Sequence, residues 1–337
     1  MAPALLVPDI LLYVDEVERN GGSGRELRNA CRRGMLVRVR RGAYCPREAW
    51  ESLLPEERHV LAIRAVIRRL HGPYLVAGPS AAAVHGLPYA ARGLGDVTLL
   101  VPYAGGGSSE PGVRRTCVAF ERAAADLRDG IPVTTPARTV LDLARTLDFG
   151  RAVAVADRAQ WRRARDPIPR DVLFDELDRA RFPHGSRAVE RVVAFSTGLS
   201  DSVGESETRA AIHRLGFETP VLQRQWRDDE GLIESDYYWE SVDTAGEFDG
   251  KVKYTRAEFT QGDPAEVVWR EKRREDRLRR LTSGVVRLVT DEVRDPLRLA
   301  RILVDAGIPR AHGRTQGVRF IAAEGGTRGS ATRQNPL

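Results

Sequence analysis

Four charged side chains in the last third of the chain have types and spacing that could do chemistry together. Glu247, Asp249 and Lys251 alternate along one predicted strand, so their side chains should point to the same face of a sheet. Asp236 lies in the predicted strand before it. Carboxylates bind hard divalent cations, and a nearby lysine suits the phosphate that such a cation would polarise. We therefore expect Asp236, Glu247 and Asp249 to hold Mg²⁺ or Mn²⁺, with Lys251 as the charge-stabilising cation.

A structural role for the same strand face is the alternative. Glu247, Asp249 and Lys251 would then form a solvated face, and Arg274 or Arg287 would pair the acids. The sequence leaves both interpretations open, because a motif does not by itself establish a bound metal.

The predicted elements around these acids run in the order helix, strand, strand, strand, helix, strand. They are the helix 205–215, the strands 222–226, 233–238 and 246–254, the helix 267–281 and the strand 285–289. The second helix keeps its apolar residues on one stripe and leaves its cations exposed. We expect Lys272, Arg274 and Arg277 to hold a DNA backbone through contacts that ignore base sequence and weaken with salt.

Residues 200–310 resemble the PD-(D/E)xK restriction-endonuclease-like superfamily, particularly its compact very-short-patch-repair-like branch. In that superfamily an aspartate lies on one strand, and an acid, one intervening residue and a lysine lie on the next. Asp236 matches the aspartate, and the run DGK at 249–251 matches the short motif literally. The resemblance implies a restriction-endonuclease-like α/β core and Mg²⁺-dependent hydrolysis of DNA phosphodiesters.

The same strand permits a second register. The run EFDG at 247–250 is similar to the E-x-D-G run of the short-patch branch, and it would place Asp249 where a lysine is usual. Glu205, on the predicted first helix, resembles a further catalytic acid often found in such sites, and Glu207 is the second choice.

The N-terminal segment combines two predicted helices with a basic hairpin. Helical periodicity over residues 10–19 precedes a second helix that Ser23 can cap, and the hairpin VRVRRGAY follows at 37–44. Residues 25–47 include eight arginines and one acid, a local net charge of +7. This order is typical of a winged helix, whose second helix enters the major groove of double-stranded DNA while the wing contacts the backbone. A solvated arginine-rich hairpin is the alternative. The expected DNA contacts are Arg32, Arg33, Arg38, Arg40 and Arg41.

The region after the hairpin is predicted to be mixed α/β. Its expected elements are helices over 55–70 and 137–147 and strands at 96–101, 115–120 and 131–134. Together with the hairpin it resembles the AbiEi-like antitoxins of type IV toxin–antitoxin systems. The motifs are GMLVRVRRGAY at 34–44, YLVAGPSAAAVHGLP at 74–88 and IPVTTPARTVLDLAR at 131–145. The resemblance implies DNA binding, autoregulation of a promoter and, as a further hypothesis, a cognate nucleotidyltransferase-like toxin as partner.

These patterns predict an α/β multi-domain protein. Its expected parts are a winged helix over 1–50, an α/β antitoxin-like domain over 51–165, a helical connector over 166–199, a nuclease-like domain over 200–310 and a disordered tail over 311–337.

Composition limits the possible partners and the cellular location. Lys and Arg number 53 against 47 for Asp and Glu, a net charge of +6 that favours a polyanionic partner. The three cysteines have no metal-ligand or disulfide spacing, as expected for a protein of the reducing cytoplasm. No apolar run approaches the roughly 20 residues that span a bilayer, so we expect no membrane partner.

Two functions fit this organisation best. The favoured one is a DNA-binding, antitoxin-like transcriptional regulator whose C-terminal domain keeps a nuclease-like fold. The alternative is an active Mg²⁺-dependent DNA endonuclease of a defence or repair system, targeted by the winged helix. The favoured function depends on the +7 segment, and the alternative depends on the acids and the lysine of the C-terminal strands.

Overall fold

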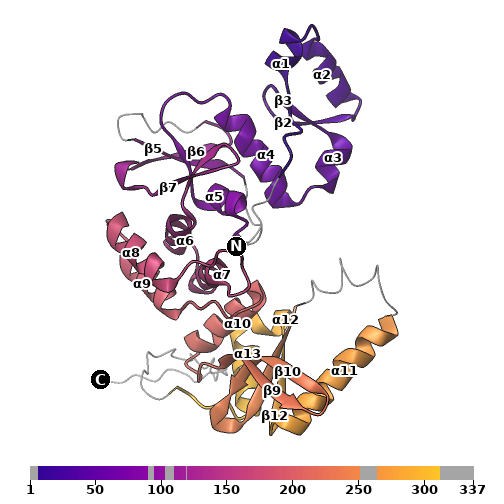
Figure 1. The fold of residues 1–337 in the computed structure, drawn as a ribbon, viewed down its shortest axis with the longest axis vertical. Coiled ribbons are helices and arrows are strands. Elements are labelled where there is room, and N and C mark those ends of the chain that lie inside the picture. Colours follow the sequence, from indigo (N-terminus) through magenta and orange to yellow (C-terminus); the bar gives the residue numbers. More distant parts are fainter. Residues whose placement is uncertain (1–6, 90–94, 103–109, 119, 251–263, 312–337) are drawn as a thin grey trace, which may run out of the picture.

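The computed structural model describes residues 7–89, 95–102, 110–118, 120–250 and 264–311. It shows a mixed α/β protein with three separate sheets, which follow one another along the long axis of the molecule (Figure 1). Lys251 and residues 312–337, which contain nearly all of the predicted disordered tail, lie outside the described residues.

The N-terminal unit has a three-stranded sheet in the order β1-β3-β2. Its elements are β1 (Leu12–Tyr13), α1 (Val14–Arg19), α2 (Gly24–Arg32), β2 (Leu36–Arg40), β3 (Ala43–Pro46) and α3 (Arg47–Ser52). Ser23 caps α2 as predicted, in a capping box with Glu26. Gly42, at φ +81°, turns β2 into β3. The hairpin and the second helix are therefore where the sequence predicted them.

The prediction of a helix over residues 10–19 is partly wrong. The helix begins only at Val14, because Leu12 and Tyr13 pair with Tyr44 and Ala43 of β3. Pairing with a strand that lies 30 residues away in the sequence overrides the local helical periodicity.

The middle unit has a five-stranded sheet in the order β6-β5-β4-β8-β7. Its first elements are α4 (Pro55–Ile67), β4 (Leu75–Val76), α5 (Gly78–His85), β5 (Val97–Pro102), β6 (Val113–Val118), β7 (Ala125–Arg128) and β8 (Ile131–Thr134). The predicted helix 55–70 and all three predicted strands are present. The strands β4 and β7, of two and four residues, were not predicted. Figure 1 shows α4 between this sheet and the N-terminal unit.

Four helices follow this sheet: α6 (Pro136–Ala144), α7 (Phe149–Gln160), α8 (Arg170–Ala180) and α9 (Ser186–Phe195). Thr135 caps α6, since its side chain accepts the Arg138 N–H. The predicted connector is two helices, because Arg181 and Gly185 both adopt positive φ between them. All four helices bury their apolar faces in one core, which also takes in Ala210 of the next helix, α10 (Val203–Arg214).

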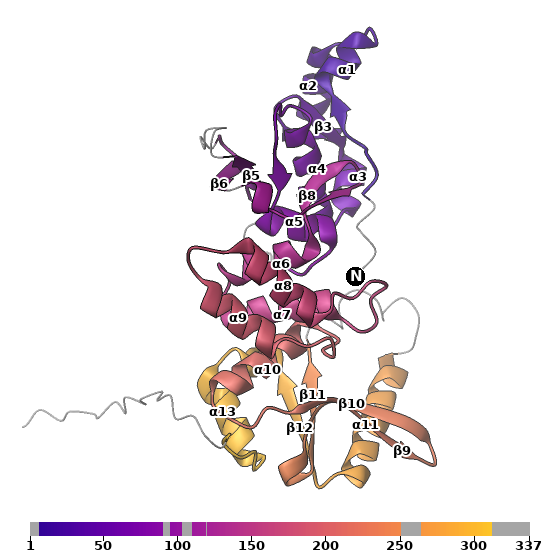
Figure 2. The same ribbon diagram turned by 60° about the vertical axis from the view of Figure 1, so that its left-hand side comes forward.

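The C-terminal unit has a four-stranded sheet in the order β12-β11-β10-β9. Its elements after α10 are β9 (Val221–Asp228), β10 (Gly231–Trp239), β11 (Thr244–Asp249), α11 (Pro264–Leu281), β12 (Gly284–Val289), α12 (Thr290–Val293) and α13 (Pro296–Asp305). Strands β9, β10 and β11 are antiparallel, whereas β11 and β12 are parallel. Figure 2 shows α10 and α13 on one side of these strands and α11 on the other. The predicted order of elements is confirmed as far as β12, and the sequence missed α12 and α13.

Within the part of the chain that the structure describes, no helix is both long enough and apolar enough to cross a bilayer.

Candidate functional site

Asp236 lies where the C-terminal sheet is interrupted. Next to it on β9, Gln223 has φ +53°, a conformation that is uncommon and costly for a residue other than glycine. On the other side, the pairing of β10 with β11 ends at Tyr237 and Gly246. One step further, the Asp236 carboxylate replaces a backbone acceptor and accepts a 2.8 Å hydrogen bond from the Phe248 N–H. The regular ladder is therefore broken on both sides of Asp236, and the strained backbone of Gln223 makes this position a candidate for function.

Glu247 and Asp249 flank Phe248 on β11. Phe248 packs into the core between the sheet and its helices, so strand alternation turns both acids to the opposite face, as the sequence predicted. Glu247 forms an ion pair with Arg274 of α11, and Asp249 lies 3.9 Å from the guanidinium of Arg287 on β12. Arg274 and Arg287 are the two arginines expected to pair the acids if this strand face has a structural role.

Glu205 lies in the first turn of α10 and is 5% exposed. Its carboxylate accepts hydrogen bonds from the Asp201 N–H at 2.9 Å and from the Gln223 amide at 3.3 Å. Burial, followed by repulsion from Asp236, raises the pKa of Glu205 to about 7. Two carboxyl groups from different elements therefore repel each other at the interruption in the sheet. Glu207, the second choice, instead faces α7, where its Cα lies 3.9 Å from the Cβ position of Gly150.

Gly204 allows α10 to lie directly on β11. A Cβ built at this position would be 2.1 Å from the ring of Phe248, closer than any real contact. The absence of a side chain thus lets the first turn of α10 bring Glu205 to the edge of the same strand that carries Glu247.

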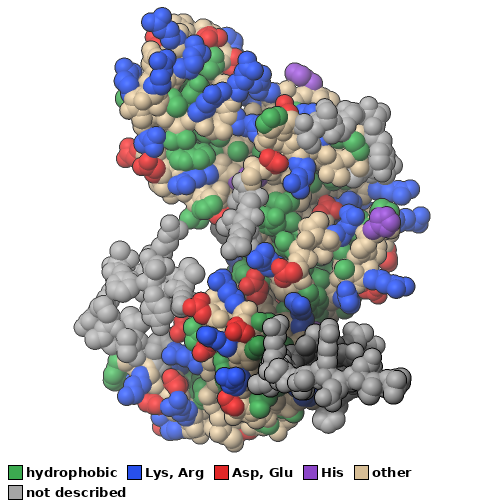
Figure 3. All heavy atoms as spheres, turned by 180° about the vertical axis from the view of Figure 1, so that it is seen from behind, with side chains coloured by type: hydrophobic (Ala, Val, Ile, Leu, Met, Phe, Trp, Pro, Cys, Tyr) green, Lys and Arg blue, Asp and Glu red, His purple; other side chains and the backbone are tan. Residues whose placement is uncertain are grey.

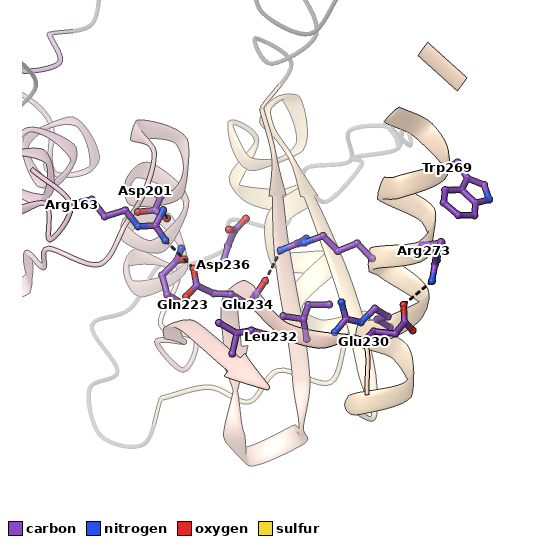
Figure 4. A pocket seen from close by; sticks show the side chains of 12 residues that line it. Arg163, Asp201, Gln223, Glu230, Leu232, Glu234, Asp236, Trp269 and Arg273 are labelled. Atoms are coloured by element: carbon purple, nitrogen blue, oxygen red, sulfur yellow. Dashed lines mark hydrogen bonds and ion pairs between the residues drawn. The ribbon is translucent and has the colours of Figure 1, made fainter. Parts of the chain in front are cut away.

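A pocket of about 530 Å³ opens beside these acids (Figure 4). Asp236 and Gln223 line its middle, Arg163 lies on the side of the middle unit, and α11 forms the other wall with Trp269 and three arginines. The full lining is Arg163, Asp201, Gln223, Glu230, Leu232, Ile233, Glu234, Asp236, Trp269, Arg273, Arg274 and Arg277. Cations on opposite walls, with acids between them, suit a phosphate backbone that crosses the pocket.

Ion pairs hold the arginines of both walls in place. Arg273 and Arg280 contact Glu230 at 2.8 and 2.7 Å, and Arg277 contacts Asp228 at 2.6 Å. On the other wall, Arg163 contacts Asp201 at 2.7 Å and Glu234 at 3.3 Å. Of the three cations predicted on α11, Arg274 and Arg277 line the pocket, whereas Lys272 is exposed and does not line it.

The acids supply part of a coordination shell for a divalent cation, and other ligands would complete that shell. No group of three or more His, Cys, Asp or Glu side chains within the described residues is arranged to hold a metal ion. Asp236 and Glu247, on neighbouring strands, still supply hard carboxylate oxygens. Mg²⁺ commonly takes only one or two protein carboxylates, and water and substrate phosphates fill the other positions. Lys251, the predicted charge-stabilising cation, lies outside the described residues.

The predicted DNA contacts of the N-terminal unit differ in their surroundings. Arg32, Arg33, Arg38 and Arg41 are exposed. Arg40 is partly buried, and its guanidinium donates hydrogen bonds to the carbonyls of Gly112 at 2.8 Å and Pro111 at 3.0 Å. Figure 3 shows many basic side chains over the N-terminal unit, and all of them are arginines because this unit has no lysine. This surface therefore keeps four of the five predicted arginines available to a polyanion.

Sequence reasoning missed most side chains of the pocket, among them Gln223, Arg163 and Trp269. Gln223 belongs to no motif, and its importance comes from a backbone conformation that composition does not reveal. Arg163 precedes Glu234 by 71 residues and reaches it only through the packing of α7 against α10. Trp269 is the one aromatic of the cationic helix 267–281, so its type could have drawn attention to it.

The comparison with solved structures gives a distant likeness. The crystal structure of the RV2827C protein from Mycobacterium tuberculosis is 17% identical, with a TM-score of 0.29, and the match covers 60% of this chain and 72% of that chain. No protein-family model matches the chain, and no curated protein sequence matches it either. These comparisons assign no family to the chain.

Proposed function

We propose that the protein is a metal-dependent DNA endonuclease that its N-terminal unit directs to double-stranded DNA. The observation that carries this proposal is the position of Asp236. It lies at an interruption of the sheet, repels the buried Glu205 and lines a pocket with arginines on both walls. Such a combination of strained backbone, a perturbed carboxyl pKa and convergent cations is typical of an active site.

The arrangement of elements supports the same proposal. A helix, three antiparallel strands, a crossing helix and a parallel strand form the order that the resemblance to PD-(D/E)xK enzymes implies for residues 200–310. The acids of β10 and β11 lie next to each other in that order, since Asp236 accepts the amide hydrogen of Phe248.

Each residue would have a defined part in phosphodiester hydrolysis. Asp236 and Glu247 would hold Mg²⁺ or Mn²⁺, which when bound acidifies a water molecule for attack on phosphorus. Arg274 and Arg163, on opposite walls, would orient the phosphate. Gln223 and Glu205 would position Asp236. Gln223 lies next to Asp236 in the sheet and donates a hydrogen bond to Glu205. Glu205 acts on Asp236 through the repulsion between the two carboxylates. Asp249 is a third candidate ligand, which Arg287 now pairs.

A nicking assay tests the proposal. The full-length protein is incubated with supercoiled plasmid and Mg²⁺ or Mn²⁺, beside Asp236→Asn, Glu247→Gln and the exposed-acid control Glu240→Gln. The amide variants keep the shape of the side chains but remove the charge that a cation needs. We expect nicking by the wild type and by the control but not by the two site variants. Equal nicking by all four proteins, or none with either metal, would contradict the proposal.

A second candidate function follows from the N-terminal unit. Its exposed arginines suit the phosphate backbone whether or not the C-terminal site is active. The protein would then be an antitoxin-like regulator that binds its own promoter, and a nucleotidyltransferase-like toxin would be its partner. This function predicts a specific gel shift with the upstream DNA of its own gene, which Asp236→Asn leaves unchanged.

A further inference from the structure

We propose that Arg274 couples metal binding to DNA binding in the C-terminal site. In the absence of DNA its guanidinium holds Glu247, and a DNA phosphate releases that carboxylate by binding the guanidinium in its place. The inference rests on the proposed function, since it assumes that Glu247 is a ligand of the cation.

The position of Arg274 is the first observation. One nitrogen of its guanidinium forms the ion pair with Glu247 on β11, and the other donates to the backbone carbonyl of Glu234 on β10. The side chain of Glu247 is 17% exposed, whereas that of Arg274 is 40% exposed and lines the pocket. The guanidinium thus covers the acid, and its exposed part lines the pocket.

The neighbouring arginines of α11 are the second observation. Arg273 and Arg280 pair with Glu230, and Arg277 pairs with Asp228. Neither of these acids is a candidate metal ligand. Among the α11 side chains that the structure describes, Arg274 alone forms an ion pair with a candidate metal ligand, Glu247. The helix therefore offers a matched control one residue away.

Charge gives the coupling its direction. A guanidinium on Glu247 occupies the carboxylate and repels an incoming divalent cation, so the metal binds weakly while this ion pair persists. A phosphate attracts the planar guanidinium through charge-assisted hydrogen bonds and also supplies oxygen ligands to the cation. Because coupling between two ligands is reciprocal, the metal should raise the affinity for DNA by the same factor as DNA raises the affinity for the metal.

Binding measurements on the full-length protein test this inference without any readout of cleavage. Mn²⁺ affinity is measured by electron paramagnetic resonance without DNA, for the wild type, Arg274→Ala and the control Arg273→Ala. We expect Arg274→Ala to bind Mn²⁺ about fivefold or more tightly than the wild type, in the range typical of coupled sites. Arg273→Ala should bind it as the wild type does, and adding Glu247→Gln to Arg274→Ala should remove the gain.

The reciprocal measurement uses a short duplex with and without Ca²⁺, an oxygen-seeking cation that occupies such sites. We expect Ca²⁺ to raise duplex affinity about fivefold or more for the wild type and clearly less for Arg274→Ala. If the wild type binds Mn²⁺ and Arg274→Ala binds it with the same affinity, the coupling is overturned. Plasmid nicking by the wild type would then still support the proposed nuclease. Absence of Mn²⁺ binding in every variant, together with absence of nicking, would overturn the proposed function as well. Thermal unfolding of each variant establishes that it is folded.

Discussion

The guanidinium of Arg209 and the carboxylate of Asp157 form a buried ion pair that joins α10 to α7. The contacts are 3.0 and 3.2 Å long, and the two side chains are 5% and 1% exposed. Asp157 also accepts the Thr197 N–H at 2.7 Å, and Arg209 donates to the carbonyl of Phe195 at 3.0 Å. The helix that carries Glu205 is thereby fixed to the helices of the middle unit, so the candidate site and the middle unit should unfold together.

Removing one partner of this pair should destabilise both units. Arg209→Leu leaves the Asp157 carboxylate buried without its cation, and loss of one partner of a buried pair typically costs about 3–5 kcal/mol. Urea denaturation should show this loss in a single transition. The control Arg151→Ala removes an exposed partner of Asp148 on the same helix α7 and should change stability by less than about 1 kcal/mol. Two separate transitions in the wild type would show that the units are independent.

Gly204→Ala should displace α10 from β11. Because the new Cβ meets the Phe248 ring, we expect a loss of about 1–3 kcal/mol in the free energy of unfolding, as overpacking does elsewhere. Phe248→Leu should relieve part of this loss in the double variant, which a double-mutant cycle would measure. Gly150→Ala on α7 is the control: its Cβ would meet Asp148 and the α10 residues Glu207 and Ala210 only at ordinary distances of 3.6–3.9 Å, so it should be neutral or stabilising by up to about 1 kcal/mol. Equal effects at both glycines would contradict the tight approach of α10.

Strand alternation was the most reliable guide from the sequence. It predicted that Glu247 and Asp249 share a face, and the packing of Phe248 into the core agrees with this. Local signals also located the helix that Ser23 caps and the turn at Gly42. These features depend on residues within a few positions of each other, which is the distance over which side-chain periodicity and capping act.

Features that depend on long-range contacts could not be predicted. Tyr13 is a strand residue only because Ala43 lies beside it, and Arg163 reaches Glu234 only because α7 packs on α10. The ion pair of Arg274 with Glu247 was named among the possibilities, but no sequence rule chooses between an arginine and a metal for the same carboxylate. Such choices are made by the distance between elements, which the sequence pattern does not record.

Arginines of the N-terminal hairpin and its helix should contribute to DNA binding according to their exposure. Arg33→Ala with Arg38→Ala removes two exposed cations, so the slope of log affinity against log salt should fall by about 2. Arg40→Ala should leave the slope nearly unchanged, because its guanidinium already binds the carbonyls of Pro111 and Gly112. Fluorescence anisotropy with a labelled duplex at several salt concentrations gives both slopes. An unchanged slope in the double variant would place the DNA interface elsewhere.

The stability of the protein should fall as the pH rises through the pKa of Glu205. Its folded-state pKa of about 7 lies above the ordinary value of 4.5, so between these pH values the folded state binds more protons than the unfolded state. The stabilisation from the protonated carboxyl is complete below about pH 4.5 and is lost as the pH passes 7, for a total on the order of 3 kcal/mol. Glu205→Gln keeps the neutral side chain at every pH, so its stability should not show this loss. Urea denaturation at pH 5.5 and pH 8, with EDTA present to exclude bound metal, compares the two proteins. A parallel decline in wild type and variant would assign the pH dependence to another group and leave Glu205 an ordinary buried acid.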